Sequence, residues 1–460
     1  MSRGKIEVRL IRSPISVIGM WLTTATAVTF LVVFLADLFG LHTNPYIGIL
    51  FFLVLPTFFL IGLVLIPLGA WIERRRRAAG KGPSVVHWPR IDLNIASQRR
   101  TAVGIFALTM ANVVIVSLAA YRGVEYMDST QFCGQVCHQV MTPEFVAYQD
   151  GPHSRVTCVQ CHIGPGASWF ARSKVSGMRQ VIAVARGSYS RPIASPVQNL
   201  RPAREVCEQC HWPEKFHGDK VRKISEYGDD EKNTESVTTL QVHVGGGNPR
   251  MGAATGIHSN HMNVERDIEY ITTDDKRQVI AYVRAKDRDG NVREYFADGV
   301  TPDALAKGER RRMDCIDCHN RPSHPIAATA ERAVDESIAR GEIPVTLPFV
   351  RREVVKAIKA DYPSQAAASD AIASALREFY RTQQNAVYMG KRQDVEKAVT
   401  AASGVYRRNV FPEMNVRFGT YLNNIGHMDS PGCFRCHDDN HKTKDGKAIG
   451  QECDTCHSIE

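Results

Sequence analysis

The stretch that organises this chain is residues 132–162, which read FCGQVCHQVMTPEFVAYQDGPHSRVTCVQCH. It holds two cysteine pairs, and a histidine directly follows the second cysteine of each pair. The first pair, Cys133 and Cys137, has three intervening residues, whereas the second, Cys158 and Cys161, has two. A long apolar run ends shortly before this stretch. A pattern of paired thiols and imidazoles therefore begins where the chain leaves a predicted membrane segment.

The cysteine count extends this pattern along the chain. All 12 cysteines fall into pairs, and the second cysteine of every pair is followed by one of the 16 histidines. Two thiols at this spacing can form thioethers to one porphyrin, and the adjoining imidazole can bind its iron. Zinc sites and disulfides do not require a histidine after every second cysteine. We therefore predict six covalent c-type haems, held by Cys133, Cys137 and His138; Cys158, Cys161 and His162; Cys207, Cys210 and His211; Cys315, Cys318 and His319; Cys433, Cys436 and His437; and Cys453, Cys456 and His457.

Three apolar runs predict a membrane anchor of three transmembrane helices, at residues 14–40, 46–72 and 101–121. Pro56 and Pro67 predict a kink in the second helix. A signal peptide explains the first run poorly, because the run is too long and lacks a small-residue cleavage site.

The distribution of charge predicts the topology. The formal net charge is +9, and much of the excess lies in short basic runs beside apolar segments, such as residues 74–77. The positive-inside rule places the amino terminus and the 73–100 loop in the cytoplasm, so the third helix leads outward. We therefore expect a bacterial inner-membrane protein with a periplasmic haem domain. The sequence has no basic stripe with interleaved aromatic residues, so nucleic acid is not an expected partner.

Composition changes along the chain predict its domain organisation. We expect an anchor at 1–122, a domain with the first three haems at 123–220, a β-rich insertion at 221–310, and a last part at 311–460 with the fourth haem, a helical region and the fifth and sixth haems. Alternating patterns predict strands at 236–244, 267–272, 278–284 and 292–296. Helical periodicity over 326–410 predicts three or four helices. The predicted fold is mainly α-helical and packed around haems, with little conventional core, so we expect folding to require haem.

Residues 166–187 mix apolar side chains with Arg172, Lys174 and Arg179. This pattern is typical of an amphipathic helix that lies on a membrane surface. A helix that packs its apolar face on haems is the alternative.

The remaining histidines are candidates for the second axial position of each iron, because haems that carry electrons usually have two axial ligands. The candidates are His153, His217, His243, His258, His261, His324, His427 and His441. Of these we favour His153, His324, His427 and His441, which lie nearest to cysteine motifs. At the first motif, either Met141 binds the iron or His138 binds it in the usual way and Met141 only packs.

Four segments resemble the NapC/NirT family of membrane-anchored periplasmic quinol dehydrogenases. They are FCGQVCHQVM, PHSRVTCVQCH, REVCEQCH and CIDCHNRPSH, and the resemblance covers residues 120–220 and 310–325. It implies that Met141 binds the first haem, His153 the fourth and His324 the second, and that Lys174 lies near the quinol site. The chain departs from the short family pattern in the first motif, in its three predicted anchor helices and in its length. The longer arrangement looks like the inner-membrane multihaem cytochromes of metal-respiring bacteria.

The resemblance implies oxidation of quinol or menaquinol at the membrane surface and transfer of its electrons to a periplasmic cytochrome or reductase. Lys174, Glu144, Asp128 and Arg179 are the candidate quinol-site residues. One alternative is a passive electron-carrying subunit of a larger respiratory complex. As to assembly, a homo-oligomer and a complex subunit are both candidates. Another is a terminal reductase of an oxyanion, which the surplus of histidines disfavours because it needs an iron with an open position.

Overall fold

The structure is a computed structural model of the chain. It describes residues 13–38, 55–80, 92–100, 102–104, 106–107, 110, 122, 125–136, 138–197, 200–215, 218–247, 254–262, 266–286 and 289–460. These residues form two compact units, the first within 1–127 and 163–178, and the second within 128–162 and 179–460. Each unit is described by itself.

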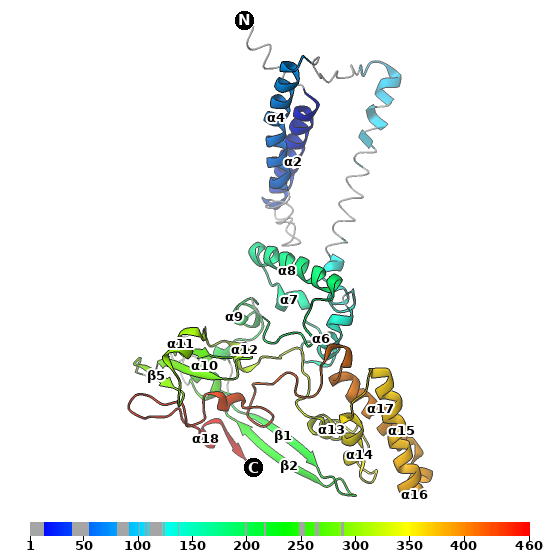
Figure 1. The fold of residues 1–460 in the computed structure, drawn as a ribbon, viewed down its shortest axis with the longest axis vertical. Coiled ribbons are helices and arrows are strands. Elements are labelled where there is room, and N and C mark those ends of the chain that lie inside the picture. The colour runs from blue at the N-terminus through cyan, green and yellow to red at the C-terminus, as the bar shows by residue number, and fades with distance from the viewer. Residues whose placement is uncertain are drawn as a thin grey trace. The chain divides into compact units, whose positions relative to one another are not determined.

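The first unit contains two apolar helices that lie side by side, α2 (Pro14–Leu38) and α4 (Leu55–Ala78) (Figure 1). They approach closely at glycines, since a Cβ added at Gly62 would lie 2.8 Å from the backbone nitrogen of Thr23. The Ser16 hydroxyl donates a hydrogen bond of 2.8 Å to the Ile66 carbonyl of the other helix. Small residues and interhelical hydrogen bonds are typical of helix packing in membranes.

Among the described residues, Thr57–Ala78 is the one helix long and apolar enough to span a membrane, and Pro14–Thr29 is a shorter apolar helix. Helix α4 continues beyond the predicted end at residue 72, because its last turn contains three arginines, which are good helix formers. The third predicted span, 101–121, lies largely outside the described residues, so the three-helix anchor stays a prediction.

In the second unit, the cysteine motifs lie on short helical turns. These elements are η2 (Phe132–Val136), α7 (Cys158–His162), α9 (Ala203–Cys207), α12 (Cys315–Cys318), η5 (Gly432–Arg435) and α18 (Cys453–Cys456). Helix α6 (His138–Asp150) continues from the first motif. Helix α8 (Ala167–Arg186) follows the second motif, and its residues 167–178 belong to the first unit. The short helices η3 (Pro213–Lys215), α10 (Gly256–Met262), α11 (Pro302–Lys307) and η4 (Pro412–Met414) lie between the motifs.

Two small antiparallel sheets follow the third motif. The first has the order β1-β2-β7, formed by β1 (Lys220–Tyr227), β2 (Glu235–Val242) and β7 (His457–Ile459). The second has the order β5-β4-β3-β6, formed by β3 (Glu269–Thr272), β4 (Ile280–Lys286), β5 (Val292–Phe296) and β6 (Glu309–Arg312). Strands β1, β6 and β7 were not predicted. In β7, His457 pairs with Val242, so the last cysteine motif is joined to the β-rich region by backbone hydrogen bonds.

Residues 330–409 form a helical bundle with a conventional apolar core, which corrects the expectation of little conventional core. Its helices are α13 (Ala330–Ala339), α14 (Val350–Lys359), α15 (Gln365–Gln383), α16 (Asn385–Gly390) and α17 (Arg392–Asn409). Helices α15 and α17 lie side by side (Figure 1). Apolar side chains at helical spacing are fully buried between the helices of the bundle, including Val354 of α14, Ile372 and Leu376 of α15, and Val395 of α17. This core contains no cysteine motif.

Candidate haem-binding site

Each described motif histidine faces a second histidine. The ring centroids are 6.2 Å apart for His162 and His324, 6.0 Å for His211 and His153, 6.2 Å for His319 and His258, 5.8 Å for His437 and His261, and 6.2 Å for His457 and His427. A bond between a metal and an imidazole nitrogen is about 2.0 Å long, which puts two rings on opposite sides of one metal about 6 Å apart. Each pair therefore has the spacing of two imidazoles that share one iron.

Hydrogen bonds orient four of these rings. The Nδ1 atoms of His153, His324, His261 and His437 lie 3.1, 2.9, 2.8 and 2.7 Å from the backbone carbonyl oxygens of Pro322, Glu144, Ile257 and Gly450, respectively. A carbonyl oxygen can only accept, so each Nδ1 carries the proton. This tautomer leaves the lone pair of Nε2 for a metal, as in most histidine-bound metal sites.

The protonation state of the buried rings also suits a metal. Burial lowers the pKa of His162, His258, His261 and His319, so these imidazoles are neutral at pH 7. A metal ligand must be neutral imidazole. The spacing, the tautomers and the charge state together fit bis-histidine ligation of c-type haem.

One short helix contributes two of the facing histidines. In α10, His258 faces His319 of the fourth motif, and His261 faces His437 of the fifth. The helix is attached to the end of β2, because the His258 backbone nitrogen donates to the Val244 carbonyl at 3.0 Å. The same short helix therefore positions the facing histidines of both the fourth and the fifth motif.

Cysteines of successive motifs lie near one another. The Cys133 and Cys158 side chains lie within hydrogen-bonding reach of each other, as do those of Cys207 and Cys315. Three further pairs are close enough for their charges to interact, namely Cys161 with Cys207, Cys318 with Cys433, and Cys433 with Cys456. The six motifs therefore follow one another in space in the order in which they occur in the sequence.

The extra residue of the first motif is accommodated by a π-helical turn, Phe132–Val136. Such a turn holds one residue more than an α-helical turn, and π-turns are frequent at functional sites. It packs closely on α6, since a Cβ added at Gly134 would lie 2.0 Å from Cδ2 of Phe145. Cys137 and the side chain of His138 lie outside the described residues, so the ligation of the first haem stays a prediction.

The structure differs from two expectations for the second ligands and agrees with a third, the placement of His324 at the second motif. His153 faces His211 of the third motif, not His319 of the fourth, whereas His324 faces His162 of the second. His441 is 2% exposed, and both its ring nitrogens are hydrogen-bonded, Nδ1 to Asp438 at 2.8 Å and Nε2 to the Ile280 carbonyl at 2.9 Å. It therefore has no ring nitrogen left for iron.

Two other histidines lack an assignment. The ring of His243 is hydrogen-bonded to Asp219 at 2.9 Å, and its backbone nitrogen donates to the Cys456 carbonyl at 2.8 Å. His217 lies outside the described residues. Neither is needed to pair the five described motif histidines.

The candidate quinol-site residues occupy different surroundings. Both carboxylate oxygens of Glu144 are engaged by Arg321, with a shortest distance of 3.0 Å, so this side chain has a partner that the sequence did not suggest. Lys174 Nζ lies 4.5 Å from the centroid of the Phe170 ring within α8. Asp128 precedes the first motif in the second unit, and Lys174 belongs to the first unit. A common site for these residues stays a prediction.

Helix α8 exposes an apolar stripe. Val175, Met178, Val181 and Ile182 are 46–65% exposed. Arg172, Arg179 and Arg186 recur at every seventh position, so they follow one flank of this stripe. The pattern suits a helix at the boundary between lipid and water.

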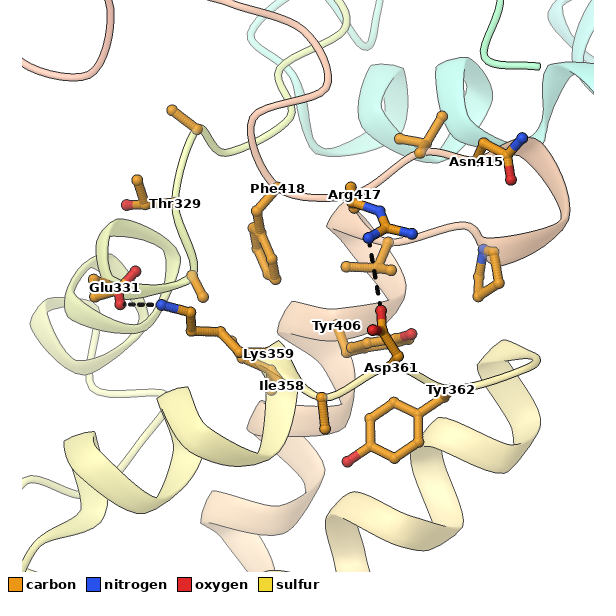
Figure 2. Close-up of a pocket in the computed structure, with 16 residues that line it drawn as sticks. Thr329, Glu331, Ile358, Lys359, Asp361, Tyr362, Tyr406, Asn415, Arg417 and Phe418 are labelled. Carbon is orange, nitrogen blue, oxygen red and sulfur yellow. Dashed lines mark hydrogen bonds and ion pairs between the residues drawn. The ribbon is translucent and has the colours of Figure 1, made fainter.

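A pocket of about 380 Å³ lies beside the helical bundle and contains no motif cysteine or histidine (Figure 2). Its charged side chains pair with one another. Lys359 Nζ is 2.8 Å from Glu331, and an Arg417 nitrogen is 3.7 Å from Asp361. Tyr362 and Tyr406 add aromatic surface. Because these charges are already paired, the pocket gives no indication of a ligand.

Sequence reasoning missed the groups that orient the rings. Backbone carbonyls such as those of Pro322 and Gly450 have no signature in a sequence. Arg321 had one signal, since it lies between the fourth motif and His324 in the segment CHNRPSH.

Paired cysteines with adjoining histidines, together with histidine pairs spaced for one iron each, define a multihaem c-type cytochrome that takes part in electron transport. The chain belongs to the NapC/NirT cytochrome c family. The family's N-terminal region matches residues 96–194. The chain is also 42% identical over 450 residues to the cytochrome c-type protein ImcH of Geobacter sulfurreducens, which covers 97% of this chain and 88% of that protein. No solved structure matches the chain.

Proposed function

We propose that this cytochrome oxidises quinol at the periplasmic surface of a bacterial inner membrane and passes the electrons through six haems to a periplasmic acceptor. The observation that carries the proposal is the set of five histidine pairs at 5.8–6.2 Å, which lie along motifs that are consecutive in space.

Each pair would hold one haem from both sides, with the motif cysteines attached to its edge. When bound, each haem supplies a one-electron redox centre. Burial keeps His162, His258, His261 and His319 neutral, and backbone carbonyl groups fix the tautomers of His153, His261, His324 and His437. Two histidines at each of these five sites would fill both axial positions of a haem and leave none open for an oxyanion, which disfavours a terminal reductase.

The order of the motifs favours a linear electron path. Neighbouring cysteines connect the first motif to the second and each later motif to the next, ending at Cys453–Cys456 near the carboxyl end. Electrons would enter near the first motif, which follows the predicted anchor, and leave near the last. A periplasmic cytochrome or reductase is the acceptor that fits this direction.

Quinol oxidation releases two protons for every two electrons, so the site needs proton acceptors. We assign this role to the Asp128 carboxylate. Lys174 and Arg179, which share α8, are proposed as donors to the quinol oxygens. Glu144 is not retained, because Arg321 engages its carboxylate. Met141, in the first turn of α6, is the proposed iron ligand of the first haem.

The proposal is tested by mixing the haem-loaded protein, purified in detergent, with a reduced menaquinol analogue and following haem absorbance. We expect reduction, and a slower rate in Lys174→Ala. Lys397→Ala removes an exposed lysine of α17 and is the matched control, which should keep the wild-type rate.

Two outcomes would contradict the proposal. If quinol fails to reduce the haems while a reduced cytochrome succeeds, the chain is a passive carrier. Turnover of nitrite or hydroxylamine by the isolated chain would instead support a terminal reductase.

A further inference from the structure

A buried ion pair lies beside one of the histidine pairs. Arg321 Nη2 is 3.0 Å from Glu144 Oε2, and Nη1 is 3.3 Å from Oε1. The two side chains are only 10% and 13% exposed. The guanidinium carbon lies 4.1 Å from the centroid of the Tyr421 ring, which is itself buried. Charges shielded from water in this way act on their neighbours more strongly than surface charges do.

The ion pair contacts His324 at three points. The ring Nδ1 donates to the Glu144 carbonyl at 2.9 Å and lies 3.4 Å from the Glu144 carboxylate. Arg321 Nε donates to the His324 carbonyl at 2.9 Å. The two charged residues therefore determine both the orientation of this ring and the charge next to it, and the ring faces His162.

The same segment also orients a second facing histidine. The Pro322 carbonyl accepts from Nδ1 of His153, which faces His211. The backbones are close here, since a Cβ added at Gly151 would lie 3.0 Å from the Ser323 carbonyl oxygen. Residues 321–324 thus include His324, the second ligand at the second motif, and orient His153, the second ligand at the third motif.

We propose that Glu144 and Arg321 are positioning residues that set the reduction potential of the haem at the second motif, and this inference rests on the proposed function. A carboxylate beside Nδ1–H makes the imidazole a stronger donor and stabilises the oxidised iron, which lowers the potential. The Arg321 cation acts in the opposite direction. The balance of the two charges sets the reduction potential of this haem relative to the potentials of the neighbouring haems.

The test is a redox titration of the haem-loaded protein with chemical reductants and oxidants, together with electron paramagnetic resonance of the oxidised form. In Glu144→Gln we expect one haem to shift to higher potential, and in Arg321→Gln the same haem to shift to lower potential. Both variants should keep low-spin signals. Asp335→Asn is the matched control, because it removes a carboxylate of similar burial from its ion pair with Arg351 in the helical bundle. It should shift no haem.

Shifts in the same direction for both variants, or a high-spin signal in both, would overturn the proposal and indicate a structural role only. If Glu144→Gln does not assemble, Arg321→Lys decides the question. Lysine keeps the charge, so it should restore the potential that Arg321→Gln lowers, and equal shifts in the two arginine variants would refute tuning by charge. Because chemical titrants set the potential, the shift is measured whether or not quinol reduces the protein. A failure of the proposed function is therefore distinguishable from a failure of this inference.

Discussion

Ile372, in the middle of α15, allows a quantitative test of the helical core. Its side chain is 0% exposed. Ile372→Ala removes three carbon atoms, and at about 0.8 kcal/mol per buried CH₂ the lost transfer free energy is about 2.4 kcal/mol. The cavity left behind adds to this, within the range of about 2–5 kcal/mol for such substitutions. We expect a loss of about 3 kcal/mol in the free energy of opening the bundle, which corresponds to roughly a hundredfold faster exchange of amide hydrogens.

The assay is hydrogen–deuterium exchange of the haem-loaded protein in detergent, followed in peptides from α15 and α17. Ser374→Ala, at an exposed position of the same helix, is the control and should change the opening free energy by less than about 0.5 kcal/mol. The haem spectra should be unchanged. Unaltered protection in Ile372→Ala, or a loss of protection that spreads to the cysteine motifs, would refute the view that an apolar core holds these helices independently of the haems.

Three further predictions concern single sites. Gly134→Ala should disturb the first haem and alter its spectrum, because the added methyl group overlaps an aromatic ring at 2.0 Å and overpacking costs about 1–3 kcal/mol. His427→Ala should add one high-spin iron in electron paramagnetic resonance, whereas His441→Ala should leave the spin state of every iron unchanged and lower only thermal stability. Hydrogen bonds from Arg377 lower the pKa of Glu396, so this pair stabilises the fold above the ordinary glutamate pKa and the stabilisation is lost as pH falls. Glu396→Gln should therefore flatten the acid side of a curve of melting temperature against pH.

The sequence identifies the residues that attach haem better than it identifies which second histidine faces each motif histidine. The motif cysteines and histidines are recognisable because the attachment of haem requires a local spacing. Nearness in sequence favoured His441, which follows the fifth motif closely. Its ring nitrogen is instead hydrogen-bonded to the carbonyl of Ile280, which is distant in the chain. His258 and His261 were candidates without a preference, because only the tertiary structure brings α10 to the fourth and fifth motifs.

The fold shows the same division between local and long-range information. Helical periodicity predicted the bundle at 326–410, since its buried faces recur at helical spacing. Strand β7 has three residues and begins at a motif histidine, so no alternating pattern marks it. It forms because Val242 and Leu240 of β2 lie alongside, which is a long-range pairing. The core of the bundle was missed because the haem count suggested that porphyrins would replace it.

The two histidines of α10 have a consequence for electron transfer between the fourth and fifth sites. The rate of transfer between two metal centres falls steeply with their separation. Here the helical bundle lies between the two motifs in the sequence, so the motifs themselves are far apart along the chain. His258 and His261 lie one helical turn apart on α10, where side chains at this spacing are about 5–6 Å apart at Cβ. If His258 and His261 hold the two irons, a single helical turn would constrain the spacing of those irons, in addition to the attachment of each haem to its own motif, and the bundle carries no residue of either site.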